Sequence, residues 1–239
     1  MERSLAKGPD IEDTHNGLAY ALWLPELTPP YPGVVVVHGA GSRKENHADF
    51  ARLATANGWG ALTFDLPGHG QSEPEMSGEA VAAVISMVDR LAVQPGVDAG
   101  RIVVRGSSLG GFLALHAAAG AGEVAAVIAI CPASEDHLAR GVRSGRFEMR
   151  VGDPVDLEAW LVAQDVTAAV RRIAGRPLIL LHAEGDTQIP SDHSAELYEE
   201  AGEPRKLVIV PGGAHTSVQH DPEIQSMALR WVERELERP

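Results

Sequence analysis

One pentapeptide restricts the fold of this chain more than any other segment. Gly106-Ser107-Ser108-Leu109-Gly110 follows the pattern G-x-S-x-G and lies between an apolar run at 102–104 and a helix-compatible run at 112–119. A strand, a sharp turn and a helix in this order present the central serine at the turn, in the arrangement called a nucleophile elbow. Because glycine has no Cβ, the flanking glycines let the strand and the helix approach closely. The pattern therefore predicts a strand–turn–helix unit with Ser108 exposed at the mouth of the helix.

A serine hydroxyl becomes a useful nucleophile only next to a base, and the base needs a group that orients it. The chain supplies both farther along, each just after a strand-like run: Asp186 in the turn at 183–190, and His215 after a Gly-Gly turn. In an open α/β sheet the carboxyl ends of the parallel strands share one edge, where ligands bind. Ser108, Asp186 and His215 are therefore expected to meet at that edge, as nucleophilic catalysis requires.

Strand-like and helix-like segments alternate along the chain, which predicts an α/β fold with a mostly parallel sheet. Asn16-Gly17 is a hairpin signal, so residues 18–24 are expected in an antiparallel edge pair. The four valines at 34–37 suit a strand buried on both faces. Further strands are expected at 59–64, 101–105, 124–130, 178–181 and 207–210, and helices at 46–56, 79–91, 112–119, 191–201 and 223–237.

Four motifs in order extend this interpretation over nearly the whole chain, from Leu18 to Leu236. They are His38-Gly39-Ala40-Gly41, Asp65-Leu66-Pro67-Gly68-His69-Gly70, the G-x-S-x-G pentapeptide, and the turns that carry Asp186 and His215. Together they resemble the α/β-hydrolase superfamily, and within it the small-cap serine esterases and dienelactone-hydrolase-like enzymes. The resemblance implies one domain over residues 1–239, with about eight sheet strands, helices on both faces and a small cap insertion at 134–175.

The resemblance also implies a role for each site residue. Ser108 would be the nucleophile, His215 the general base and acid, and Asp186 the carboxylate that holds the imidazole. The backbone N–H groups of Ala40 and Leu109 would form an oxyanion hole. Each such donor stabilises the developing charge by about 3–4 kcal/mol.

Some of these assignments have rivals in the sequence. Ser107 is adjacent to Ser108, but the motif spacing favours Ser108 as its centre. The rivals of Asp186 are Glu184 and Asp192, and those of His215 are His182, His193 and His220. His38 is expected to help fix the oxyanion turn, and Asp65–Gly70 is expected to be a tight loop to which no chemistry is assigned.

The stretch between Pro132 and Arg176 contains no obvious strand, and residues 157–173 have helical character. A connection this long is usually functional or carries its own structure, and in the family a cap there largely determines the substrate. Within it, residues 139–150 hold four arginines, of which Arg143 and Arg146 are candidates to bind an anionic substrate; the alternative is a solvated or ion-paired surface. Phe147, Met149 and Trp160 are candidates for an apolar pocket wall, although packing within the cap explains them equally well.

Composition limits the partners. The chain has 239 residues with 33 acidic and 20 basic side chains, a formal net charge of −13, which argues against nucleic acid or an anionic membrane as partner. The sole cysteine, Cys131, is expected to be a buried thiol. Met1–His15 has no apolar stretch that would form a signal peptide, so a cytoplasmic location is expected. No metal or organic cofactor is expected, since no metal-binding motif is present. Homodimer formation is left open.

The function expected from these residues is hydrolysis of small-molecule carboxylic esters with short to medium acyl chains through an acyl-enzyme. A thioesterase, an aminoacyl peptidase or an acyltransferase could use the same three residues. A dienelactone hydrolase usually has cysteine as nucleophile, so Ser108 argues against that activity. A pseudo-hydrolase that only binds ligands would normally have lost one of the three residues, and all three are present.

Overall fold

The computed structural model describes residues 7–238, so the start of the segment 1–15, for which no signal peptide is expected, lies outside the described residues. The strands are β1 (Ile11–His15), β2 (Leu18–Trp23), β3 (Tyr31–Val37), β4 (Gly60–Phe64), β5 (Val97–Ser107), β6 (Val124–Ile130), β7 (Leu178–Ala183) and β8 (Arg205–Val210). The helices are α1 (Ala48–Ala56), α2 (Ala80–Ala92), α3 (Leu109–Gly120), α4 (Glu135–Arg143), α5 (Pro154–Val162), α6 (Val166–Arg172), α7 (Ser191–Glu200) and α8 (Pro222–Leu236), with 3-10 helices η1 (Lys44–His47) and η2 (Val218–His220).

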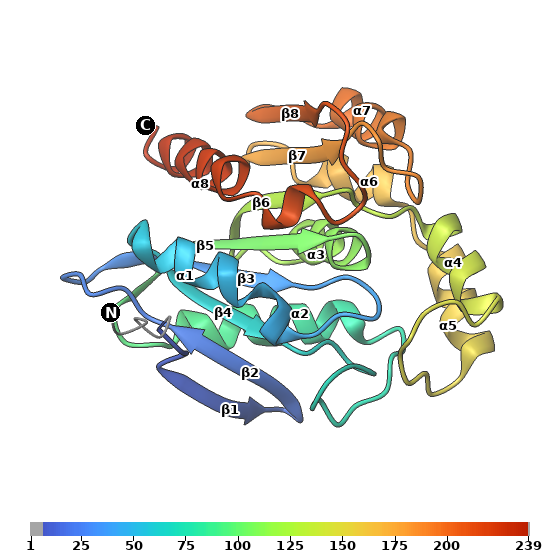
Figure 1. Cartoon of the computed structure of the whole chain (residues 1–239), viewed down its shortest axis with the longest axis horizontal. Coiled ribbons are helices and arrows are strands. Elements are labelled where there is room, and N and C mark those ends of the chain that lie inside the picture. The colour runs from blue at the N-terminus through green and yellow to red at the C-terminus, as the bar shows by residue number, and fades with distance from the viewer. Residues whose placement is uncertain (1–6, 239) are drawn as a thin grey trace, which may run out of the picture.

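The eight strands form one sheet in the order β1-β2-β4-β3-β5-β6-β7-β8 (Figure 1). The pairs β1–β2 and β2–β4 are antiparallel, and every other neighbouring pair is parallel. Asn16 and Gly17 both have positive φ, as the hairpin between β1 and β2 requires. The predicted α/β fold with a mostly parallel sheet of about eight strands is confirmed.

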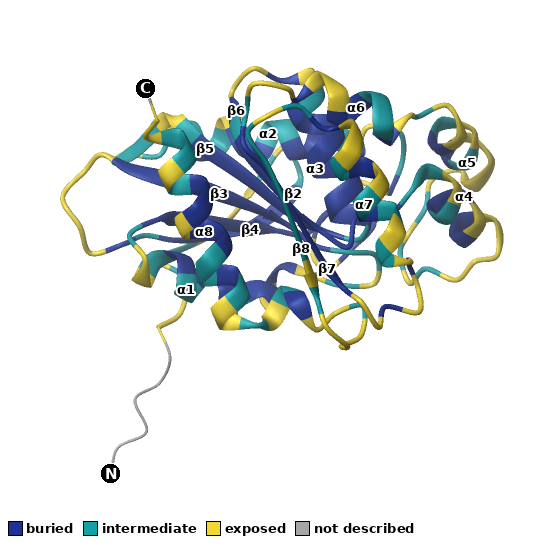
Figure 2. Cartoon of the chain, turned by 90° about the horizontal axis from the view of Figure 1, so that it is seen from above, coloured by how far each residue is buried: buried dark blue, intermediate teal, exposed yellow. Residues whose placement is uncertain are grey.

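Helices cover both faces of the sheet, and each face has its own apolar core. Helices α1 and α8 cover one face, and α2, α3, α6 and α7 cover the other (Figure 2). The central strands are buried on both sides, as the four valines of β3 show, because a parallel sheet between two helical layers leaves neither face in water. Within residues 7–238, no helix is long and apolar enough to cross a membrane.

The segment between β6 and β7 contains three helices with different surroundings. Helices α4 and α5 pack against each other and lie beyond the edge of the sheet toward which the parallel strands point (Figure 1). Helix α6 packs against α3 and so belongs to the layer that covers the sheet. The part of segment 134–175 that overhangs the carboxyl edge is therefore α4, α5 and the loop at 144–153.

Candidate active site

Ser108 occupies the sharp turn between β5 and α3, so the predicted strand–turn–helix unit is present. Its φ of 54° and ψ of −117° belong to a region that residues other than glycine seldom adopt. The Ser108 N–H donates to the carbonyl of Ile130 at 2.9 Å, and its own carbonyl accepts the N–H of Phe112 at 3.0 Å. The adjacent strand and the first turn of the helix thus hold this strained conformation.

The two glycines of the motif are required by close backbone packing. A Cβ on Gly106 would lie 2.0 Å from the carbonyl oxygen of Gly110. A Cβ on Gly110 would lie 2.1 Å from the carbonyl oxygen of Val37. Since backbone atoms cannot move aside cheaply, any side chain at either position would force the turn apart.

Ser107 and Ser108 differ in their environment, although both line one cavity. Ser107 is the last residue of β5, and its side-chain hydroxyl is buried with no hydrogen-bond partner among the described residues. Ser108 is half-buried at the start of α3, where the helix N-terminus favours developing negative charge. The geometry of the turn thus distinguishes the two serines.

Asp186 and His215 are brought into contact by the loops that follow β7 and β8. His215 Nδ1 lies 2.6 Å from Asp186 Oδ2, and the N–H donates to the carboxylate. The other carboxylate oxygen accepts the backbone N–H groups of Gln188 at 2.8 Å and Ile189 at 3.0 Å. The carboxylate is therefore fixed from one side and holds the imidazole from the other.

A second histidine, His182 at the end of β7, also reaches Asp186. Its Nε2 lies 3.3 Å from Asp186 Oδ2 and 3.0 Å from the carbonyl of Ile189, and its Nδ1 lies 2.7 Å from Ser194 Oγ. Burial acts to raise the pKa of Asp186, but the hydrogen bonds from His182, His215 and two backbone N–H groups outweigh it and hold this pKa well below its usual range. Asp186 is therefore ionised at any ordinary pH.

The other candidates lie elsewhere. Glu184 is exposed, and its side chain accepts the N–H of Gly212 at 3.4 Å. Asp192 and His193 lie in the first turn of α7. His220, in η2, pairs with Asp49 of α1 at 2.7 Å. Asp186 therefore contacts two of the candidate histidines: His215, which lines the cavity with Ser108, and His182, which is fully buried and does not line it.

The loop 38–41 is held by two histidines. His38 donates from Nδ1 to the carbonyl of Gly39 at 2.7 Å and accepts the N–H of Leu66 on Nε2 at 3.0 Å. Burial, with a smaller effect of His69, lowers the pKa of His38 to about 4, so the ring is neutral and can accept this bond. His69 accepts the N–H of Gly41 at 3.2 Å. His38 thus fixes the turn as expected, and the loop 65–70 supports the turn as well.

A cavity of about 360 Å³ opens at this edge of the sheet. It is lined by loop 39–42, the turn at 107–108, segment 146–148 and loop 215–216. Ser108, His215 and Ala40 all contribute to its wall. Leu109 is the first residue of α3, so its N–H has no acceptor within the helix and is available to a bound group.

Residues 32–152, just over half of the chain, match the family model described as the alpha/beta hydrolase fold. The chain belongs to the α/β-hydrolase family. This agrees with the sheet order, the strand–turn–helix unit and the order of the loops that carry Ser108, Asp186 and His215. The resemblance inferred from the sequence is confirmed.

This α/β hydrolase is similar at low sequence identity to several known proteins. The uncharacterized protein YfhR of Escherichia coli (strain K12) is 26% identical over 193 residues, which cover 79% of this chain and 64% of YfhR. The crystal structure of the alpha/beta hydrolase GrgF from Penicillium sp. sh18 has a TM-score of 0.80 at 20% identity and covers 95% of this chain and 98% of GrgF. Est1E from Butyrivibrio proteoclasticus, with ferulic acid bound, has a TM-score of 0.76 at 19% identity and covers 95% of this chain and 100% of Est1E. These two structures share the fold.

The cap arginines of the hydrolase have different surroundings. Arg143 pairs with Glu158 of α5 and contributes to neither the large cavity nor the apolar pocket beneath the cap. Arg140 pairs with Asp136 on the exposed side of α4. Arg146, in contrast, lines the large cavity. The alternative of an ion-paired surface therefore applies to Arg140 and Arg143, whereas Arg146 lies at the large cavity.

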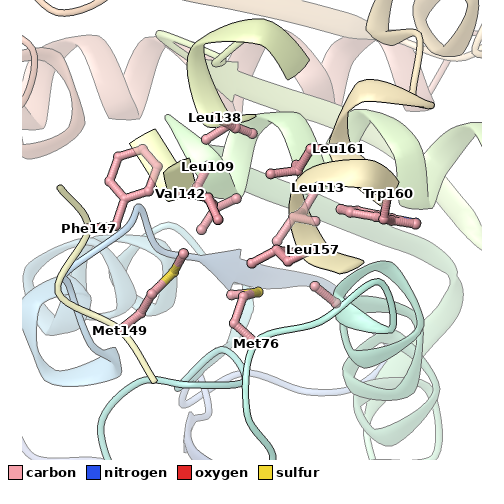
Figure 3. A pocket seen from close by; sticks show the side chains of 11 residues that line it. Met76, Leu109, Leu113, Leu138, Val142, Phe147, Met149, Leu157, Trp160 and Leu161 are labelled. Carbon is pink, nitrogen blue, oxygen red and sulfur yellow. The ribbon is translucent and has the colours of Figure 1, made fainter. Parts of the chain in front are cut away.

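Phe147 and Trp160 border an apolar pocket between α3, α4 and α5 (Figure 3). Side chains nearly fill this pocket, since its free volume is about 10 Å³, roughly the space of one water molecule. Phe147 lines both this pocket and the large cavity, whereas Trp160 lines the pocket alone and packs edge-on against Phe112 at 6.2 Å. Met149 lines it too. Phe147 is thus the side chain shared by the two spaces.

Cys131 is buried, as expected, and lies next to Asp186 and His215. Potential metal-ligand atoms of these three side chains lie within 4.8 Å of one another. Burial, with Asp186 nearby, raises the pKa of the Cys131 thiol to about 12, and the Asp186 and His215 atoms already bind each other. This donor set suits a hydrogen-bonded acid–histidine pair better than a thiolate metal site.

His137 and Glu148, which were not predicted from the sequence, also line the large cavity. Ser134 accepts the N–H of His137 at 3.2 Å and caps α4. Ser134 followed directly by the acidic residues Glu135 and Asp136 is a helix-start signal that would have put His137 in the first turn of a helix. No comparable signal marks Glu148.

Proposed function

We propose that this hydrolase is a serine esterase that cleaves carboxylic esters of short to medium acyl chain through an acyl-enzyme. The observation that carries the proposal is the 2.6 Å hydrogen bond from His215 Nδ1 to Asp186 at a cavity that Ser108 also lines. That bond holds the proton on Nδ1 and leaves Nε2 as the basic atom. An ionised Asp186 stabilises the imidazolium that forms when Nε2 takes a proton.

In the acylation step, Ser108 Oγ attacks the ester carbonyl carbon and its proton passes to His215 Nε2. The carbonyl oxygen becomes an oxyanion, which the N–H groups of Leu109 and Ala40 would bind. The tetrahedral intermediate then collapses, and the bond from carbon to the alcohol oxygen breaks as His215 donates its proton to that oxygen. The acyl group remains as an ester of Ser108.

In the deacylation step, His215 takes a proton from a water molecule that attacks the acyl carbonyl. The same N–H groups would hold the second oxyanion. Collapse releases the carboxylic acid, and His215 returns the proton to Ser108 Oγ. The cycle leaves the protein unchanged and consumes one water for each ester.

The two spaces at the site support a limit on chain length. The large cavity is bordered by polar loops, and the apolar pocket beyond Phe147 has almost no free volume. A long acyl chain would have to displace side chains of α4 and α5, and opening a packed apolar contact is costly. Short chains fit without that rearrangement.

The proposal is tested by hydrolysis of p-nitrophenyl esters from acetate to palmitate by the wild-type protein and by Ser108→Ala. Turnover is expected to peak at short to medium chains and to be lost in Ser108→Ala, while Ser107→Ala keeps it. Activity that survives in Ser108→Ala would overturn the nucleophile assignment. If the wild type is inert on all chain lengths, the ester proposal fails, and thioesters, aminoacyl amides and acyl acceptors become the substrates to assay.

A further inference from the structure

Arg146 is the one arginine among the described cap residues 134–175 that lines the cavity with Ser108 and His215. Its terminal nitrogen lies 3.0 Å from His137 Nε2, and its guanidinium carbon stands 5.1 Å from the ring centre of Phe147. Unlike Arg140 and Arg143, it forms none of the ion pairs found within residues 7–238. The cavity therefore holds a cation that is positioned by neutral neighbours.

His137 adds no second charge near neutral pH. An arginine N–H can only donate, so His137 Nε2 accepts and the ring is in its neutral form. Partial burial, Arg146 and Arg140 lower the pKa of His137, and His215 lowers it further, while Asp186 acts in the opposite direction. The pair thus carries one positive charge, which matches a carboxylate better than a dianionic phosphate.

The acidic side chain of the cavity lies in another part of its wall. Glu148 stands over loop 39–42, where a Cβ on Gly41 would lie 3.8 Å from the Glu148 Cβ. Arg146 is held instead at His137 on α4. Arg146 and Glu148 form no ion pair with each other, so the wall carries one cation and one anion that do not neutralise each other.

We propose that the natural ester carries a free carboxylate, which Arg146 binds with its guanidinium fork beside His137. This rests on the serine esterase function proposed above and names its substrate class. Phe147 holds the guanidinium plane from one side, and Glu148 repels the carboxylate from the Gly41 part of the wall. The carboxylate sets the register of the ester relative to Ser108.

Two pairs of esters test this proposal and show which half of the ester bears the carboxylate. Mono-p-nitrophenyl adipate and p-nitrophenyl hexanoate differ by a carboxylate in the acyl part. The butyrate esters of 4-hydroxybenzoate and 4-hydroxybenzamide differ by a carboxylate in the alcohol part. For each pair, the measured quantity is kcat/KM of the anionic ester divided by kcat/KM of the neutral ester. In at least one pair, Arg146→Gln should lower this ratio about tenfold, which is the low end of what a hydrogen bond to a charged group contributes.

Arg143→Gln is the matched control, because it removes the same charge from the same cap at a position paired with Glu158 outside the cavity. It should leave both ratios at the wild-type value. Glu148→Gln should change the ratio in the opposite direction and favour the anionic ester. Raising the ionic strength should reduce the wild-type preference, since the charge of the exposed Arg146 is screened by salt.

Equal ratios in the wild type and Arg146→Gln for both pairs would overturn the carboxylate proposal while leaving the esterase intact. Loss of the wild-type activity on all four esters would count against the esterase instead. In that case calorimetric binding of monomethyl adipate and of 4-(butyryloxy)benzoate to Ser108→Ala still tests the inference. Binding of either that Arg146→Gln weakens about tenfold supports it, and binding of neither overturns it.

Discussion

At the scale of single residues, the conformation of Ser108 depends on groups outside the motif. Its positive φ persists because the carbonyl of Ile130 in β6 accepts its N–H. The surrounding backbone is also packed so closely that neither Gly106 nor Gly110 could carry a side chain. A strained residue at a functional turn is stabilised by surroundings that leave it no alternative. At this turn Ser108 is half-buried at the cavity, whereas the hydroxyl of Ser107 is buried.

Asp186→Asn should lower kcat on p-nitrophenyl butyrate by about 10³- to 10⁴-fold, since an amide no longer holds the imidazole tautomer or stabilises its positive form. KM should change little. Steady-state kinetics measures both constants. Glu184→Gln is the matched control, because Glu184 is an exposed carboxylate two residues earlier, and it should stay within about twofold of wild type. Comparable losses in the two variants would contradict the assignment of Asp186.

The sequence predicts much of the site because the relevant residues follow strands and carry turn signals. Ser108, Asp186 and His215 were each expected at the carboxyl edge, and the structure brings the last two into direct contact. The contact of His182 with Asp186 could not be predicted, because it depends on how far the loop after β7 folds back on that strand. The pairing of Arg146 with His137 depends likewise on the path of the loop after α4.

At the scale of elements, the strands were easier to predict than the cap helices. Helix α4 has a polar sequence containing Gly141, which weakens helix propensity. That glycine is required by packing, since a Cβ there would lie 2.2 Å from the Phe147 ring. The helical character seen over residues 157–173 belongs to two helices, which are separated where Asp165 caps α6 by accepting the N–H of Ala168.

Trp160→Ala should extend the acyl-chain range of the proposed ester hydrolysis. Trp160 fills one side of the apolar pocket against Phe112 and lies so close to Gly78 that a Cβ there would be 2.9 Å from the indole. Its removal leaves space for a longer acyl chain and should raise the ratio of octanoate to butyrate turnover several-fold. It should also cost about 2–3 kcal/mol of stability, less than for a fully buried tryptophan.

Val162→Ala is the control on the same helix, because Val162 is 62% exposed. It should change neither the chain-length profile nor the urea midpoint appreciably. If Trp160→Ala shifts the midpoint but keeps the wild-type profile, the apolar pocket has no part in binding the acyl chain.

At the scale of the whole molecule, two helical layers enclose the sheet and bury several histidines. Burial lowers the pKa of both His38 and His116 to about 4, whereas an unfolded imidazole titrates near 6.5. Arg172, a smaller influence, also acts on His116. Between these two values the unfolded chain binds more protons than the folded one. The contribution of these two histidines to the free energy of unfolding is therefore fully present above pH 6.5 and is lost as the pH falls toward 4.

Within this window, each such histidine should add about 1.4 kcal/mol per pH unit to the slope of the free energy of unfolding against pH. Urea unfolding at pH 7, 6 and 5 measures this slope. His116→Leu should reduce the slope by one such contribution, because the Nε2 atom of His116 is buried with no partner among the described residues. An unchanged slope in His116→Leu would show that this histidine is protonated in the folded state.

The central claim is that Ser108 is the nucleophile and that His215 activates it. The most direct measurement is labelling with a fluorophosphonate, followed by the intact mass and by peptide mapping. The wild type should gain a single adduct, located on Ser108, while His215→Ala should react far more slowly and Ser108→Ala not at all. An adduct on Ser107 or elsewhere, or equal labelling rates in wild type and His215→Ala, would contradict the account.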